Sequence, residues 1–175
     1  VGSIVAVLLS LKFDWESLYT YTTDRPWDKL FILHPTDIIN SYSNKGLYCC
    51  YDLLQKLFIP LFNAKDINIH VTMKEFYEIT NINIEIFTAS VNECNYIEIS
   101  HKTHPDLELI KALAMSTSIP FVFTPVLHDG CYYCDCGFIN NFPIIDCVNY
   151  LKNNELKTDK EIQKIILGIN GIAIK

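Results

Sequence analysis

The feature of this sequence that most constrains its fold is residues 82–91, INIEIFTASV, where apolar residues first alternate with polar ones and then occupy both faces. Alternation with a period of two is typical of a β-strand, and a strand that is apolar on both faces is typical of a buried one. Segments with helical spacing of apolar residues lie on both sides of it. Because helices alternating with apolar strands pack on a sheet, the sequence predicts an α/β fold with a largely parallel sheet.

Local signals predict the other elements. Asp14 can cap a helix over 15–21, and Thr72 with Glu75 forms the pattern of a capping box at the start of another helix. Apolar spacing predicts an almost wholly apolar, buried helix over 2–12 and further helices over 46–62, 105–116 and 144–151, with a short one after Thr36. Further strands are expected at 95–100, 132–134 and 164–170, and a stiff loop at 118–125.

Composition excludes several classes of protein. The chain of 175 residues is half hydrophobic and has a net charge of −6, which argues against a nucleic-acid surface. Seven cysteines, an odd number, favour free and mostly buried thiols in a reducing compartment, so we expect a cytoplasmic protein. The apolar run over 1–11 is too short to span a membrane, for which about 20 residues are needed.

The segment YYCDCGFINNFP, residues 132–143, admits three interpretations. His128, Cys131, Cys134 and Cys136 are residue types that bind zinc, but cysteines on an alternating strand point to opposite faces. A redox pair at Cys131 and Cys134 would be expected to open a helix. The third interpretation is a loop whose important group is Asp135, with the cysteines as ordinary buried thiols.

Three segments, in order along the chain, resemble the patatin-like phospholipases. VGSIVAVLLSL looks like the end of the family's Gly-x-Ser-x-Gly turn and the helix after it, and TMKEFYEITNINIEIFTASVNE looks like its middle segment. The third match runs from the helix before the Ile-Pro to the aspartate loop, at Ala112, Ser116, Ser118, Ile119, Pro120, Phe123, Pro125, Asp129, Gly130, Asp135, Gly137, Asn140, Asn141 and Pro143.

The resemblance implies a three-layer α/β/α fold with a largely parallel central sheet, of which residues 1–175 would be a partial domain truncated at the N-terminus. It implies a phospholipase A-type lipid acyl hydrolase that uses a Ser-Asp dyad and no cofactor, with Asp135 as the base. If Gly2 is the last glycine of the Gly-x-Ser-x-Gly turn, the serine falls immediately before Val1, and this chain carries the aspartate without the serine and the oxyanion loop. Ser3 does not replace it, because Ser3 lacks the flanking glycines.

Four residues follow or break the family pattern around the aspartate. Gly137, Asn140 and Asn141 keep its register, and the two asparagines are expected to bind backbone at the entry to the next helix. Cys136 stands where the family has glycine, which puts the local geometry in question if that position needs a positive φ.

The resemblance also implies partners: a lipid ester as substrate and transient contact with a membrane surface, with no nucleic acid. None of the five histidines falls in an obvious triad position, so we interpret them as structural or surface residues. The alternative to a hydrolase is a non-catalytic, degenerate member of the family or a small zinc-binding module on the cysteine cluster.

Overall fold

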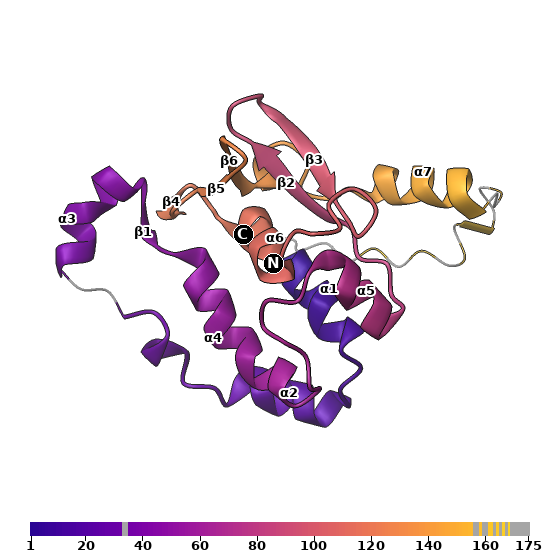
Figure 1. Ribbon diagram of the computed structural model, residues 1–175, viewed down its shortest axis with the longest axis horizontal. Helices are drawn as coiled ribbons and strands as arrows, with labels where there is room; N and C mark the ends of the chain where they lie inside the picture. Colours follow the sequence, from indigo (N-terminus) through magenta and orange to yellow (C-terminus); the bar gives the residue numbers. More distant parts are fainter. Residues whose placement is uncertain are drawn as a thin grey trace, which may run out of the picture. The chain divides into compact units, whose positions relative to one another are not determined.

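The computed structural model describes residues 1–32 and 35–155, together with residues 158, 161, 162, 164, 166 and 168 (Figure 1). The chain forms two compact units, Val1–Cys136 and Gly137–Lys175. Helices and strands are mixed along it, which confirms the α/β class. The strand predicted over 164–170 lies largely outside the described residues.

The first unit begins with two short helices. In α1 (Gly2–Ser10) Val7 and Leu8 are buried, whereas Val5 and Leu9 are 40% and 45% exposed. The prediction of a helix buried on nearly every face was therefore wrong, because only one stripe of α1 packs on the core. α2 (Trp15–Thr23) begins as predicted, with the Asp14 carboxylate accepting a hydrogen bond of 2.8 Å from the backbone of Ser17.

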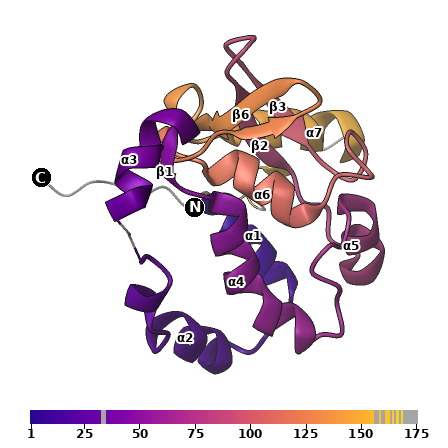
Figure 2. The same ribbon diagram turned by 60° about the vertical axis from the view of Figure 1, so that its left-hand side comes forward.

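The segment after α2 carries a 3-10 helix η1 (Trp27–Lys29) and the helix α3 (Pro35–Asn44). In both ribbon views this segment leads from α2 up to β1 (Gly46–Tyr48) on one side of the unit (Figures 1 and 2). The helix predicted from Gly46 begins later, as α4 (Cys50–Asn63), because β1 pairs in parallel with β4 (Phe121–Phe123). β4 lies in the stretch that was predicted to be a loop.

The larger sheet has four strands in the order β3-β2-β6-β5. β2 (Ile86–Ser90) and β3 (Asn95–Ile99) form one hairpin, and β5 (Val126–His128) and β6 (Cys131–Asp135) form the other. All its pairings are antiparallel. In the two hairpins this follows from the short turns, which can join only antiparallel neighbours. The parallel direction expected for the sheet is thus found only in the β1–β4 pair among the described strands.

β5 had not been predicted from the sequence. The turn that joins it to β6 consists of Asp129 and Gly130, both with positive φ, at 47° and 78°. A two-residue turn with positive φ at both positions matches the twist of a hairpin, and Asp-Gly is one of its preferred sequences. The Asp-Gly pair was therefore the signal for a strand on either side.

Helix α6 (Leu109–Thr117) packs against β2 and β6, the two central strands of this sheet. Its side chains Leu109, Ile110, Ala112, Leu113, Ala114 and Met115 are all fully buried. The Thr88 hydroxyl of β2, also fully buried, lies 2.8 Å from the Met115 carbonyl of α6 and 2.9 Å from the Cys134 carbonyl of β6. One side chain of β2 thus links its own strand to α6 and β6.

Helix α5 (Met73–Thr80) shows the predicted capping box in full. The Thr72 hydroxyl accepts from the Glu75 backbone at 3.2 Å, and the Glu75 carboxylate accepts from the Thr72 backbone at 2.8 Å. In the second unit, α7 (Ile144–Glu155) forms where a helix was predicted. No helix within the described part of the chain is long and apolar enough to cross a membrane.

Gly46 is a position where the pairing of β1 with β4 depends on the absence of a side chain. A Cβ there would overlap the backbone of Phe123 and Thr124. We expect Gly46→Ala to push the two strands apart and to lower the free energy of unfolding by about 1–3 kcal/mol, measured by chemical denaturation. Gly2→Ala is the control, since a Cβ at Gly2 meets no atom within 4 Å. Equal stability of the two variants would contradict the close approach.

Candidate active site

Asp135 is the last residue of β6, where the chain leaves the four-stranded sheet. Its backbone N–H donates a 2.9 Å hydrogen bond to the carbonyl of Ser118, directly after α6. In the register of the sheet it lies opposite Thr88 of β2. The backbone of Asp135 is therefore held from two sides.

Asp135 is one of the residues that line a cavity of about 290 Å³. Its walls are almost entirely hydrocarbon, and Asp135 is the one carboxylate among the described residues that form them. The other lining residues come from α1, the segment after α2, α4, the end of α6 and β4: Val1, Ile4, Trp27, Leu30, Phe31, Cys50, Leu53, Leu54, Leu57, Thr117, Ile119 and Phe123. A carboxylate at the wall of an apolar cavity is an arrangement that suits acid–base chemistry on an apolar substrate.

The sequence did not reveal most of this cavity. Trp27 lines the cavity, and its indole N–H donates at 2.8 Å to the Thr22 carbonyl. Leu30 and Phe31 were not singled out, although the run WDKLFI is unusually apolar for a segment between helices. That apolar run was the signal that could have found them.

The motif residues next to Asp135 are placed as follows. Cys136 is buried and is not among the described residues with positive φ, so its Cβ meets no left-handed strain. Gly2 opens α1, with nothing near the position of a Cβ. In the second unit Gly137 and Asn141 are exposed, and the Asn140 amide donates at 3.2 Å to the Asp146 carboxylate in the first turn of α7.

The cysteine cluster offers no ligand set within the described residues. No group of three or more His, Cys, Asp or Glu side chains in the described part of the chain is arranged to hold a metal ion. All seven cysteines are free thiols, and burial raises the pKa of the Cys134 thiol above its ordinary value. A neutral, buried thiol is a poor nucleophile and a poor metal ligand.

None of the four described histidines lines the cavity that contains Asp135. His101 stacks on Tyr77 with ring centroids 3.8 Å apart, and His128 lies 3.3 Å from the Lys111 ammonium. His34 lies outside the described residues.

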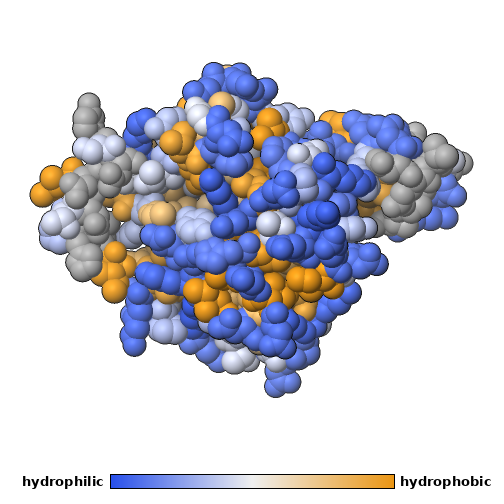
Figure 3. Space-filling model, in the orientation of Figure 1, coloured by the Kyte–Doolittle hydropathy of each residue, from blue (hydrophilic) through white to orange (hydrophobic). Residues whose placement is uncertain are grey.

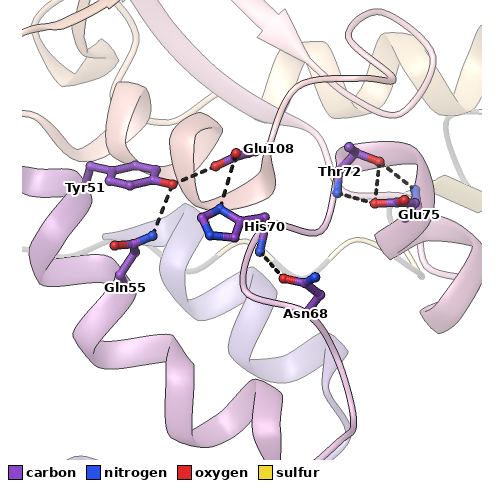
Figure 4. A network of polar contacts seen from close by, with 7 residues as sticks. All are labelled: Tyr51, Gln55, Asn68, His70, Thr72, Glu75 and Glu108. Carbon is purple, nitrogen blue, oxygen red and sulfur yellow. Dashed lines mark hydrogen bonds and ion pairs between the residues drawn. The ribbon is translucent and has the colours of Figure 1, made fainter.

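A polar network lies on another face of α4 (Figure 4). The Tyr51 hydroxyl donates to the Glu108 carboxylate at 2.7 Å and accepts from the Gln55 amide at 3.2 Å. His70 lies 3.3 Å from the other oxygen of Glu108, and its backbone N–H donates to Asn68. The network thus joins α4 and the segment before α5 to Glu108, the residue that precedes α6.

A second cavity, of about 670 Å³, adjoins this network. Tyr51 and Glu108 line it together with Lys111, His128 and Asp129. Its lining is more polar than that of the cavity at Asp135 and carries charged side chains of both signs. α4 therefore borders an apolar cavity at Cys50 and a more polar, charged one at Tyr51.

The structure is that of a mixed α/β protein with an aspartate beside an apolar cavity, and comparison with known proteins gives the family. Residues 1–148 match the family model described as "Patatin-like phospholipase". Because this match covers most of the chain, the chain belongs to the patatin-like phospholipase family. The resemblance seen in the sequence and the patatin-like α/β fold are thereby confirmed.

Two relatives come from viruses. "Probable lipid hydrolase 463L" of Invertebrate iridescent virus 6 is 26% identical over 161 residues, which are 90% of this chain and 54% of the relative. "Uncharacterized protein R571" of Acanthamoeba polyphaga mimivirus is 27% identical over 144 residues, which are 82% of this chain and 47% of the relative. The chain thus spans about half the length of each of these relatives.

Tyr51 gives the polar network a measurable signature. Burial, the hydrogen bond to Glu108 and the charge of that carboxylate raise the pKa of Tyr51 to about 12 from its ordinary value of 10. The folded state then keeps a proton that the unfolded state loses, so the free energy of unfolding should fall as the pH rises from about 10 to about 12. We expect this fall to be smaller in Tyr51→Phe, measured by denaturation between about pH 9 and about pH 11.5.

Below pH 10, Tyr51→Phe should lower the free energy of unfolding by about 1–2 kcal/mol, because the hydrogen bond to Glu108 is lost. Tyr19→Phe serves as the control, since Tyr19 is 68% exposed on α2. A Tyr51 variant with the same pH dependence as the unmodified protein would show that the network does not persist in solution.

Proposed function

We propose that this chain is the aspartate-bearing part of a lipid acyl hydrolase of the phospholipase A type. The observation that carries the proposal is the position of Asp135 at the wall of an almost wholly apolar cavity of about 290 Å³. The match to the family model and the lipid hydrolase name of the iridovirus relative support it. The substrate is a lipid ester, whose acyl chain occupies the apolar cavity.

In the proposed mechanism a serine is the nucleophile and Asp135 is its base. When Gly2 is aligned with the last glycine of the family's Gly-x-Ser-x-Gly turn, the serine falls immediately before Val1. Val1 itself lines the cavity. The serine oxygen attacks the ester carbonyl while its proton passes to Asp135, and the proton then goes to the departing alcohol. Water hydrolyses the acyl-enzyme in a second step in which Asp135 again accepts the proton and returns it to the serine, so the cycle takes no cofactor.

The start of α1 contributes to this chemistry in the proposal. The first N–H groups of a helix have no partner within it, and together with the helix dipole they favour a negative charge. Val1 and Ile4, on either side of this first turn, line the cavity. The oxyanion that forms on the ester carbonyl, when the serine oxygen attacks it, would therefore develop close to the positive end of α1. A glycine-rich loop, which the resemblance implies, would supply the remaining donors.

The role of Asp135 is tested by Asp135→Asn in a protein that carries Gly-x-Ser immediately before Val1. Loss of the base should lower kcat for a chromogenic short-chain ester by about 10²- to 10⁴-fold without loss of the fold. Asp129→Asn is the matched control, because Asp129 is exposed and lines the other cavity. Equal activity of the two variants would remove Asp135 from the mechanism.

Residues 1–175 alone should not hydrolyse this ester. Turnover by this chain that Asp135→Asn abolishes would mean that the nucleophile lies within it, so the assignment of the serine would be wrong while that of Asp135 would stand. Labelling with a fluorophosphonate probe, followed by peptide mapping, would then identify the nucleophile.

The acyl site is tested by filling the cavity. Leu53 lines it from α4 and is only half-buried, so Leu53→Phe can extend into the cavity without overpacking the core. We expect kcat/KM for long-chain esters to fall about tenfold relative to that for a two-carbon ester, because the long chain no longer fits. Ile59→Phe, at an exposed position of α4, should change neither value. Parallel losses for both chain lengths would place the acyl chain elsewhere.

A further inference from the structure

The cavity at Tyr51 has no role in the proposed mechanism, although it is the larger of the two cavities described above. Its volume of about 670 Å³ lies within the range of about 300–1,000 Å³ that is typical of sites for small molecules. Apolar and charged residues both line it. Figure 3 shows hydrophilic and hydrophobic residues interspersed over the part of the surface where Figure 1 draws α4 and α6. A ligand for this cavity therefore has to match both kinds of side chain.

One wall of the cavity at Tyr51 is held in place by backbone hydrogen bonds. This wall is the segment 104–108, which lies between β3 and α6. The Pro105 carbonyl accepts from the backbone N–H of Lys74 at 3.0 Å, and the Leu107 carbonyl accepts from that of Met73 at 2.9 Å. Both donors belong to the first turn of α5. The wall is therefore formed without a ligand, as is usual for sites that bind small molecules.

Lys111 supplies the positive charge of this cavity. Its ammonium lies 3.3 Å from Nδ1 of His128. An ammonium has no acceptor, so Nδ1 accepts this hydrogen bond and the imidazole is neutral. Among the described residues no carboxylate forms an ion pair with Lys111. Because an ammonium has three N–H donors, two of them are left for an anionic ligand.

Asp106 supplies a negative charge that has no partner. Of the described residues that line the cavity, three are carboxylates, and two of these have contacts. Glu108 accepts from the Tyr51 hydroxyl at 2.7 Å, and Asp129 lies 3.5 Å from Nε2 of His128. The Asp106 side chain lies on an exposed turn and forms no ion pair within the described part of the chain. The same cavity thus holds one unpaired cation and one unpaired anion.

These charges disfavour a ligand that carries only one charge. A simple anion at Lys111 would be repelled by the three carboxylates, and a simple cation at Asp106 would be repelled by Lys111. A ligand with both charges gains an attraction that offsets each repulsion. Leu107 and Val126 also line the cavity, and their apolar side chains suit a hydrocarbon chain between the two charged groups.

We propose that this cavity, which we call the zwitterion site, binds a small molecule that carries a carboxylate and an ammonium. The carboxylate binds Lys111 and the ammonium binds Asp106, while the hydrocarbon chain between them packs on Leu107 and Val126. The zwitterion site shares no described lining residue with the cavity at Asp135. It requires neither an ester nor a serine, so it stands apart from the proposed function.

The class of ligand is tested with chain molecules of different length and charge. The zwitterions γ-aminobutyrate, δ-aminovalerate and ε-aminocaproate are titrated into the protein by isothermal calorimetry, because the spacing of the two charges decides which of them fits. The tightest of them is then compared with its alkanoate, which lacks the ammonium, and its alkylamine, which lacks the carboxylate. We expect each analogue to bind about tenfold more weakly, because one charged contact is lost. Equal binding of either analogue, or no binding of any of the zwitterions, would overturn the proposal.

The two ends of the ligand are assigned by two variants. Lys111→Met keeps the aliphatic stem and removes the charge, and Asp106→Asn keeps the shape of its side chain. Each should weaken binding of the zwitterion about tenfold, whereas Lys111→Met should not weaken binding of the alkylamine. Lys74→Met is the matched control, because Lys74 is exposed on α5 and does not line the cavity. Unchanged affinity in either of the two variants would contradict the proposal, and Asp106→Asn, at an exposed position, tests the site without risk to the fold.

His128 reports on the carboxylate end without any substitution. Burial and the nearby charge of Lys111 lower the pKa of His128. A ligand carboxylate at Lys111 offsets that charge, so saturation with the zwitterion should raise the pKa of His128 in an NMR titration. The pKa of His101, which stacks on Tyr77 and does not line the cavity, should stay constant. If the pKa of His128 also stays constant at saturation, the carboxylate does not bind at Lys111 and the proposal is wrong.

Discussion

The burial of α6 against β2 and β6 is the constraint on which the candidate site depends. Six of its side chains are fully buried, and the Thr88 hydroxyl lies within hydrogen-bond distance of a carbonyl of α6 and a carbonyl of β6. A buried hydroxyl without such partners would be costly, so this contact fixes the helix against the sheet. Because the chain leaves α6 at Ser118, whose carbonyl accepts from the Asp135 backbone, the same packing fixes the carboxylate at the cavity wall.

Helix α4 separates two environments that differ in their physical chemistry. Its face toward Trp27 and Phe31 is apolar, so burial there depends on the exclusion of water. Its other face carries Tyr51, whose hydroxyl is bonded to Glu108 and Gln55. The network around Glu108 joins α4 to the residue before α6, while the apolar cavity keeps the surroundings of Asp135 free of other carboxylates among the residues that line it. A hydrolase that acts on lipid would use both properties.

Sequence and structure agree best where the signal is local. The Asp14 cap, the capping box at Thr72 and a hairpin formed as predicted, because each depends on residues a few positions apart. The first strand of the hairpin is shorter than predicted, because it begins at Ile86 and residues 82–85 lie outside it. The predictions that were wrong concern elements whose packing depends on residues far away in the sequence. β4 was predicted to be a loop because its partner, β1, lies more than 70 residues away and approaches closely only through Gly46. α1 was predicted to be buried because composition does not say which stripe of a uniformly apolar helix finds a partner.

The sequence by itself determined the family, the order of most helices and strands, and Asp135 as the group to examine, because these depend on motifs and short-range periodicity. Only the tertiary structure decided the antiparallel direction of the larger sheet and the cavity beside Asp135. The physical reason is that the cavity is formed by side chains from residues 1–4, 27–31, 50–57 and 117–135, which no periodicity relates. The depth and polarity of such a cavity follow from how these segments pack, and packing is a property of the folded chain.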